Sequence, residues 1–176
     1  MGNRSATPSL LAQIGSIAFG ALLFAMPARV RAANNCPLMK EATASNLVGG
    51  DTVGSFVAGQ HQPSVCTFTQ HAGNVTRALQ ISVEIINDAH GRFLSTVRED
   101  CRSKSLLVPP AIGNEAVACA VDSHRMIIGE RALGRVRNQV FTITLSTPIK
   151  DDPVLTPAML KMKIGTAAEQ VTGSLF

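Results

Sequence analysis

The sequence predicts an α+β domain in which one antiparallel sheet of about five strands is covered by helices. Three observations lead to this prediction. Several short segments alternate between apolar and polar residues, as strands with one buried face do. Other segments carry apolar residues at helical spacing. The two kinds follow one another in the order α-β-β-α-β-β-β-α, and hairpins interspersed with helices favour an antiparallel sheet.

The elements of the first half are assigned from periodicity and from the residues at their ends. Proline in the first helical turn and glycine after the last turn are common helix boundaries, and strict alternation marks strands. Two strands separated by turn residues should pair as a hairpin. The expected elements are a helix capped by Asn35 or Cys36 with Pro37 in its first turn and Gly49-Gly50 at its end, a loop over 51–64, and strands over 65–69 and 77–86.

The second half is assigned in the same way and also begins with a helix. Asn87 or Asp88 can cap this helix. Asp151-Asp152 is interpreted as an acidic turn that leads into the last helix, which begins at Thr156-Pro157. Strands are expected over 116–121, 125–131 and 139–146, with a glycine-containing connection over 132–138. The apolar stripe of the last helix consists of Leu160, Ile164, Ala167, Val171 and Leu175. Each half thus runs from a helix into a hairpin, which hints at an internal repeat.

The segment 1–32 is predicted to be a signal peptide that is removed on export. A polar start containing Arg4 precedes an apolar run over 10–26, and Val30 and Ala32 supply small residues three and one positions before the expected cleavage point. The run has 17 residues, fewer than the ~20 that a membrane-spanning helix needs. The expected mature protein is a single domain over 33–176, exported to the periplasm or secreted, which meets a membrane only through its transient signal peptide.

The formal charge of +4 belongs mostly to this N-terminal segment. Arg4, Arg29 and Arg31 leave with it and no acidic residue does, so 13 basic residues face 12 acidic ones in the expected mature chain. The chain also contains no Trp and no Tyr. A nearly neutral surface with few stacking rings argues against nucleic acid as a partner.

All four cysteines lie in the expected mature chain, and an even number in an exported protein predicts two disulfides. Three pairings of Cys36, Cys66, Cys101 and Cys119 are possible. We favour Cys36–Cys66 and Cys101–Cys119, because each pair ties a helix to the strand that begins just after it. The spacings contain no C-x-x-C pair and fit no compact zinc module. We therefore expect no metal ion and no cofactor.

Several short motifs resemble those of small, largely uncharacterised exported bacterial domains, many of them lipoproteins of actinobacterial type. Those domains often begin with Cys-x-Leu and a helix that ends in Gly-Gly, and they carry Gly-Leu-Gly-Asp-Glu-Ala before a hairpin. The matching residues are Cys36-Pro37-Leu38, Gly49-Gly50, Cys66-Thr67-Phe68 and the segment 111–116, with Ala111 and Asn114 in place of Gly and Asp. No lipobox precedes Cys36. The resemblance spans 36–176 in layout and implies an exported α+β domain but no particular reaction.

No catalytic residue is assigned from the sequence. The histidines are His61, His71, His90 and His124, and none has the spacing of a zinc protease motif. Asp122-Ser123-His124 has the residue types of a hydrolase triad, but neighbouring residues cannot form the relay that a triad requires. An enzyme would need a site that assembles only in three dimensions.

The candidate binding residues are four arginines around the last hairpin: Arg125, Arg131, Arg135 and Arg137. Guanidinium groups can bind a carboxylate or phosphate through paired hydrogen bonds. The alternative is a charged edge that prevents strands of other chains from pairing with the sheet. We therefore expect an exported, disulfide-stabilised, non-catalytic binding or accessory protein of the cell envelope, whose partner is an unknown protein or a small anionic ligand. A secreted inhibitor or immunity protein and a small hydrolase-type enzyme are the alternative functions.

Overall fold

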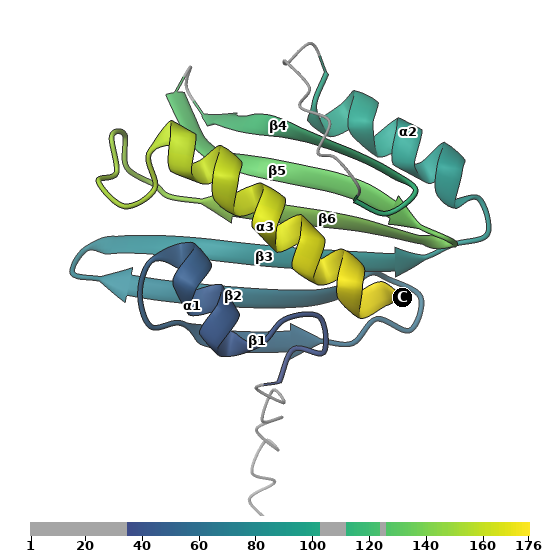
Figure 1. Ribbon diagram of the computed structural model, residues 1–176, viewed down its shortest axis with the longest axis horizontal. Coiled ribbons are helices and arrows are strands. Elements are labelled where there is room, and N and C mark those ends of the chain that lie inside the picture. The colour runs from purple at the N-terminus through teal and green to yellow at the C-terminus, as the bar shows by residue number, and fades with distance from the viewer. Residues whose placement is uncertain (1–34, 103–111, 124–125) are drawn as a thin grey trace, which may run out of the picture. The chain divides into compact units, whose positions relative to one another are not determined.

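One antiparallel sheet of six strands forms the centre of the computed structural model, which describes residues 35–102, 112–123 and 126–176 (Figure 1). All of these residues belong to one compact unit, Arg31–Phe176. The sheet order is β1-β2-β3-β6-β5-β4. The strands are β1 (Val53–Val57), β2 (Ser64–Ala72), β3 (Val75–Ile85), β4 (Glu115–Ser123), β5 (Met126–Val136) and β6 (Gln139–Ser146). The predicted signal peptide, 1–32, lies outside the described residues.

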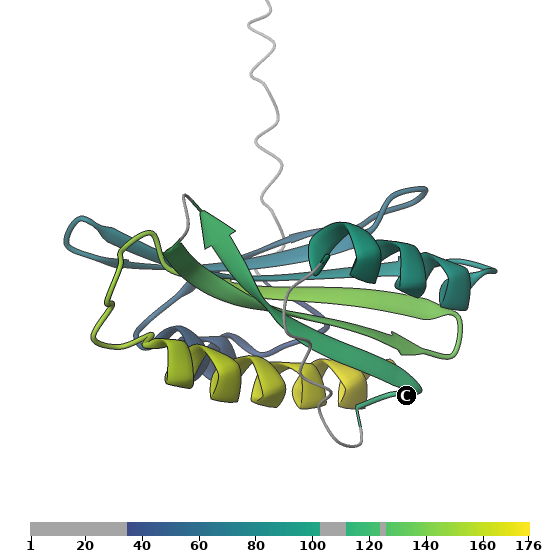
Figure 2. The same cartoon turned by 90° about the horizontal axis from the view of Figure 1, so that it is seen from above.

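The three helices are divided between the two faces of the sheet. They are α1 (Glu41–Val48), α2 (Ala89–Asp100) and α3 (Pro157–Leu175). Figure 2 shows α1 and α3 on one face and α2 on the other. On their shared face, α1 packs on β2 and β3 while α3 packs mainly on β5 and β6. On the opposite face, α2 packs on β5 and β6.

The α+β class and the antiparallel sheet are confirmed, but the expectation of about five strands misses β1. This strand lies inside the predicted loop 51–64. Gly54 occupies a buried position of β1 and Val53 an exposed one, so the strand does not show the apolar face that would identify it. The observed order is therefore a helix and three strands, a second helix and three strands, and a final helix.

Two further boundaries differ from the expectation. The predicted connection 132–138 is wrong, because β5 continues to Val136. Residue 134 is a glycine because a Cβ atom there would collide with the ring of Phe141 on β6. This glycine therefore does not mark the end of the strand. The first helix begins at Glu41 rather than near Pro37. The chain before it forms a turn in which the Leu38 backbone N–H donates to Sγ of Cys36 over 3.3 Å.

Both favoured disulfides are present, Cys36–Cys66 and Cys101–Cys119. The first joins the segment before α1 to β2, so β1 lies between the two linked elements. The second joins the C-terminal end of α2 to β4. Loops of 30 and 18 residues correspond to about 3–4 kcal/mol of stabilisation each in the chain-entropy treatment.

The core lies in two layers, one on each side of the sheet. The larger layer packs α1 and α3 against the sheet and contains Phe68, Phe141 and the stripe of α3. Leu160, Ile164, Ala167 and Val171 of that stripe are buried as predicted, and Leu175 is partly buried. The smaller layer packs Phe93 of α2 against β4, β5 and β6 around the Cys101–Cys119 disulfide.

A buried ion pair joins the middle of the sheet to the segment that leads into α3. Arg77 on β3 donates from Nε to Oδ2 of Asp152 over 2.7 Å and from Nη2 to Oδ1 over 2.9 Å. The same carboxylate accepts hydrogen bonds from Thr147 Oγ1 and from the backbone N–H groups of Val154 and Leu155. Asp152 is 1% exposed and Arg77 is 6% exposed. The carboxylate therefore links β3, the residue that follows β6 and the segment that leads into α3.

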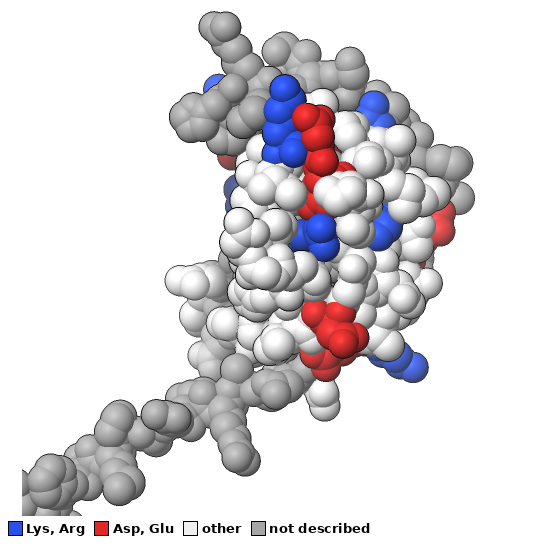
Figure 3. All heavy atoms as spheres, turned by 90° about the vertical axis from the view of Figure 1, so that its left-hand side faces the viewer, with Lys and Arg blue, Asp and Glu red and all other residues white. Residues whose placement is uncertain are grey.

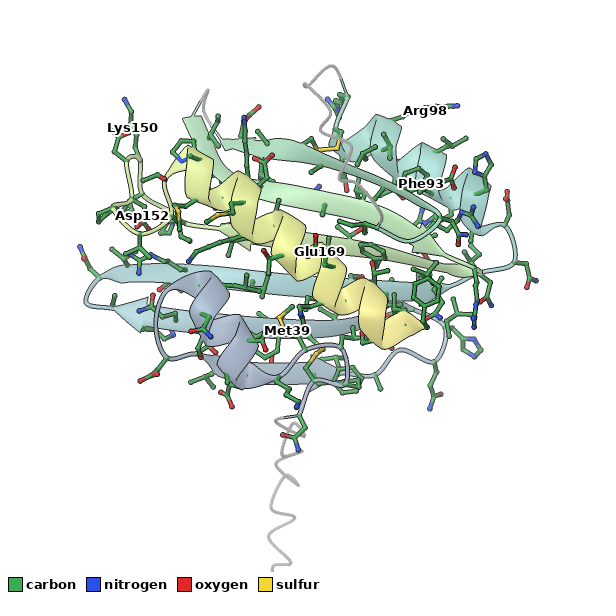
Figure 4. All side chains as sticks on the ribbon, in the orientation of Figure 1. Met39, Phe93, Arg98, Lys150, Asp152 and Glu169 are labelled. Carbon is green, nitrogen blue, oxygen red and sulfur yellow. A yellow bond between two sulfur atoms is a disulfide. The ribbon has the colours of Figure 1, made fainter. Side chains whose placement is uncertain are left out.

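Asp151 and Asp152 do precede the last helix, as the sequence predicted, but Asp152 is buried and binds Arg77 rather than only leading the helix. Asp151 is exposed, whereas Asp152 points into the protein between β3 and the start of α3 (Figure 4). Burial alone would raise the pKa of Asp152, but the hydrogen bonds from Arg77, Thr147, Val154 and Leu155 outweigh it and hold the pKa well below the usual range.

The substitution Asp152→Asn should lower the free energy of unfolding by about 3–5 kcal/mol, because it leaves the Arg77 charge buried without its partner. Urea denaturation measures this loss. Since the pKa of Asp152 is lowered on folding, its stabilisation is present above its ordinary pKa of 3.8 and is lost as the pH falls below that value. The wild-type protein should therefore lose more stability between pH 5 and pH 3 than Asp152→Asn does.

Asp151→Asn is the matched control. Asp151 is the exposed neighbour and has a left-handed φ of 58°, a conformation that asparagine adopts readily. Its effect should stay within about 0.5 kcal/mol. Equal losses for the two substitutions would show that the ion pair does not hold the fold together.

Candidate functional site

Half of one sheet face has no helix packed on it among the described residues. On the face that carries α2, the helix packs on β4, β5 and the Val140 end of β6, while β1, β2, β3 and the rest of β6 are left uncovered (Figure 2). We call this uncovered surface the open face. Its residues are Val53, Ser55 and Val57 on β1, Val65, Thr67 and Thr69 on β2, Ala78, Gln80 and Ser82 on β3, and Thr142 and Thr144 on β6.

The register places polar side chains of the open face in one row over four strands, and this row continues to Arg131 on β5, beside α2. Ser55 pairs with Thr67, Thr67 with Gln80, and Gln80 with Thr144. Thr144 pairs in turn with Arg131 of β5. We call Ser55, Thr67, Gln80, Thr144 and Arg131 the polar row. Strands lie about 4.8 Å apart, so the row is about 19 Å long.

Aliphatic side chains border this row at the outer strand. Val53 is 69% exposed and Val57 is 65% exposed. Both lie on the open face, one on each side of Ser55 along β1. The open face therefore combines hydroxyl and amide groups, which hydrogen-bond in any direction, with two exposed valines, which gain from being covered.

The charged groups at the margins of the open face are paired. Arg131 donates to Thr144 Oγ1 over 3.1 Å and lies 2.8 Å from Asp100 of α2. Glu84 at the end of β3 accepts from Arg92 of α2 over 2.9 Å. These pairs join the side of α2 to the border of the open face. A ligand on the open face would meet mostly uncharged hydrogen-bonding groups.

The four candidate arginines do not gather at one point. Arg125 lies outside the described residues. Arg131 and Arg135 lie on the α2 face of β5, four residues and hence about 13 Å apart. Arg135 donates to Glu115 Oε2 over 2.6 Å. The guanidinium of Arg137 lies over the ring of Phe176, 5.7 Å from its centre. Each described member thus has a partner within the protein.

The motif that carries the resemblance to exported domains closes the turn between β5 and β6. Gly113 has a φ of 61° and lies against the carbonyl oxygen of Arg135. The backbone N–H of Asn114 donates to that oxygen over 2.8 Å, and Asn114 Oδ1 accepts from the backbone N–H of Arg137 over 2.7 Å. Hydrogen bonds from His90 and then Arg135 lower the pKa of Glu115. These contacts explain the motif by packing and turn geometry rather than by chemistry on a ligand.

The described histidines lie apart from one another. His90 is paired with Glu115, with Nδ1 2.9 Å from Oε1, and His71 Nδ1 lies 3.1 Å from Thr76 Oγ1. His61 lines a hollow of about 340 Å³ that Ser64 and Glu84 also line. His124 lies outside the described residues. This hollow is where a three-dimensionally assembled enzyme site would be sought.

The hollow does not contain an assembled relay. Ser64 Oγ accepts from the backbone N–H of Gly59 over 3.1 Å, and Glu84 is held by Arg92. Within the described part of the chain, His61 is hydrogen-bonded to neither of them. A larger hollow of about 580 Å³ lies between the segment before α1 and the end of α3, near Met39 and Glu169 (Figure 4). Nor do any three His, Cys, Asp or Glu side chains of the described residues come together to hold a metal ion.

The visible charges alternate in sign rather than forming a patch. Seen from the left-hand side of Figure 1, basic and acidic residues lie among uncharged ones (Figure 3). Within the described residues, no helix has both the length and the apolar character needed to cross a bilayer.

The sequence did not identify the open face, although part of its pattern was visible. Thr67 and Thr69 alternate with buried residues on β2, and Thr142 and Thr144 do so on β6. This alternation marks the outward side of a strand but does not show whether a helix covers that side. Comparisons with protein-family models, with curated proteins and with solved structures found no match to this chain.

Gly113→Ala should destabilise the protein more than Gly73→Ala. The two glycines have nearly equal φ angles, 61° and 62°. A Cβ atom at residue 113 would lie 2.5 Å from the Arg135 carbonyl oxygen, whereas one at residue 73 would meet nothing within 4 Å. The difference should be about 1–3 kcal/mol, as for other overpacked sites. Thermal or urea denaturation of both variants measures it, and equal losses would contradict a packing role for the motif.

Proposed function

We propose that this protein is an exported, non-catalytic binding protein of the cell envelope, and that it binds a protein partner through the open face. The observation that carries the proposal is the half of one sheet face that no described helix covers. One face is filled by α1 and α3, and α2 covers only part of the other (Figure 2). The two disulfides support an oxidising compartment, and the resemblance to exported domains supports the same location.

The composition of the open face favours a protein as the partner. Hydroxyl and amide side chains with a margin of exposed valine are suited to the mixture of hydrogen bonds and apolar contacts in protein interfaces. The rings of Phe56 and Phe68 belong to the helix-covered side of the sheet, so sugar stacking on the open face gains no support from them. A secreted inhibitor or immunity protein is one form that such a binding protein takes.

The other two alternatives have less support from the geometry. A small anionic ligand needs guanidinium groups that are free to bind it, whereas Arg131 and Arg135 are paired with carboxylates. A hydrolase needs its nucleophile bonded to its base, whereas Ser64 accepts from Gly59 and is not bonded to His61 within the described residues.

Export predicts a defined covalent form of the protein. Expressed with its own N-terminal segment in an exporting bacterial host, it should be recovered outside the cytoplasm with Ala33 as its first residue. Its mass should also be lower by four hydrogens, and no thiol should react after denaturation, because both disulfides are formed. A full-length chain with free thiols in the cytoplasm would refute the export part of the proposal.

Site-specific photo-cross-linking tests the binding surface. A photoreactive phenylalanine derivative at Thr67 should give a covalent adduct with one envelope protein in exporting cells. The same group at Met162, which is 58% exposed on α3, is the control and should not give that adduct. The mass of the adduct must differ from that of two copies of this chain.

Affinity measurements with the captured protein complete the test. Gln80→Lys, which places a charge in the middle of the polar row, should weaken binding at least tenfold, whereas Met162→Lys should leave it unchanged. Adducts that form equally at both positions, or a Gln80→Lys variant that binds normally, would exclude the open face as the binding surface.

A further inference from the structure

Within the part of the chain that the structure describes, the outer edge of β1 is an unpaired strand edge. β1 is the first strand in the sheet order and pairs with β2 over Val53–Val57 without a register shift. Among the described residues, no backbone hydrogen bond joins β1 to any segment other than β2. Its outward backbone N–H and C=O groups are therefore available to another strand.

β1 also lacks the features that usually protect such an edge. Charged residues, proline and bulges on an edge strand prevent it from pairing with other chains. The sequence of β1, Val-Gly-Ser-Phe-Val, contains no charge and no proline. The opposite edge strand, β4, carries Glu115 and Asp122 and a register shift between Val121 and Asp122. The two edges of the same sheet are thus built differently, and only β1 is left open to pairing in this respect.

The sequence of β1 is complementary to itself when it is read in the opposite direction. In an antiparallel pair centred on Ser55, Val53 lies opposite Val57 of the second copy and Gly54 lies opposite Phe56. Val53 and Val57 are 69% and 65% exposed, and branched side chains opposite each other stabilise paired strands. Gly54, which already pairs with Phe68 on β2, has no side chain that would oppose an aromatic ring across the junction.

The charges near the edge do not oppose this pairing. The nearest one along the chain is Asp51, two residues before β1. In the register centred on Ser55, Asp51 lies opposite Gly59 of the second copy, so no like charges face each other across the junction. A two-fold axis between the two Ser55 residues gives every residue of β1 a partner in the second copy, as a symmetric dimer requires.

We propose that two copies of this protein pair through their β1 edges, antiparallel and centred on Ser55, to form one continuous sheet of twelve strands. Residues that pair across the junction have the same parity along β1, so the two open faces lie on the same side of the joined sheet. The two polar rows meet at Ser55 and continue into each other. The dimer goes beyond the proposed function, because it forms in the absence of any other protein.

Sedimentation of the purified protein tests the dimer directly. A junction of five residues on each side is small, so a dissociation constant in about the micromolar range is expected. Ser55→Lys should weaken the dimer at least tenfold, since it places two like charges opposite each other on the axis. Ser55 is exposed in the single copy, so its fold should persist.

Gln80→Lys is the matched control for charge. It adds the same charge to the same row of the open face, but two strands away from the junction. Its dimer should be as stable as that of the wild type. A wild-type protein that stays a single copy at millimolar concentration, or equal weakening by Ser55→Lys and Gln80→Lys, would overturn the proposal.

Cysteine substitution provides a second test that does not depend on charge. Directly opposed residues of antiparallel strands have Cα atoms about 4.5–5.5 Å apart, within the range of a disulfide. Oxidised Ser55→Cys should therefore form a covalent dimer through the introduced thiols, as shown by peptide mapping. In Gln80→Cys the two thiols are separated by five strand spacings, about 24 Å, and no such dimer should form.

The dimer and the protein-binding surface can fail separately. Sedimentation involves only this protein, and Gln80→Lys affects partner binding but not the junction. A dimer without a partner would leave the junction standing and remove the proposed function. A free protein that sediments as a single copy but still binds the partner would do the reverse.

Discussion

The contact between Arg77 and Asp152 fixes the arrangement on which the rest of the structure depends. Arg77 belongs to β3, the last strand of the first half, whereas Asp152 lies in the segment that joins β6 to α3. The carboxylate therefore holds the junction of the two halves and the start of the longest helix at one point. α3 then lies along the sheet beside α1 (Figure 1). α2 packs on the other side, where its 12 residues give a helix about 18 Å long and about 10 Å wide. One such helix cannot cover six strands, so among the described residues an open face follows from the number and placement of the helices.

The open face is compatible with exposure to water because of what its strands carry outward. Thr67, Gln80 and Thr144 can hydrogen-bond to water, and their backbone groups are already paired within the sheet. Their cost of exposure is small, so a large uncovered area does not threaten the fold. The valines of β1 are different, because they gain from burial and sit beside unpaired backbone groups. Apolar area and free hydrogen-bonding groups thus coincide at one strand, while the middle of the face is polar.

The sequence predicted the features that depend on local pattern, and it missed those that depend on long-range packing. The cap at Asp88, the cap at Thr156 and the stripe of α3 follow from side-chain chemistry near each helix end, and the structure confirms them. β1 was missed because Gly54, which has no apolar side chain, occupies an inward position. The end of β5 was missed because Gly134 indicates a connection in the sequence, whereas it is needed to make room for the ring of Phe141 on β6. The buried ion pair of Asp152 was not predicted, because its partner, Arg77, is 75 residues away. The open face could not be predicted from the sequence for the same reason, since the pattern of a strand does not show which helix will cover it.

The two halves of the chain repeat in order but not in space. Each consists of one helix followed by three strands, and β3 and β6 pair antiparallel where the halves meet. An axis relating two antiparallel neighbours is perpendicular to the sheet and would place α1 and α2 on the same face. They lie on opposite faces, and the disulfides follow them, with Cys66 on the side of α1 and Cys119 on the side of α2. The single chain therefore lacks this symmetry because α3 takes the place beside α1. Pairing of β1 edges would introduce such an axis between copies. The open faces of the two copies would then form one continuous surface with two-fold symmetry.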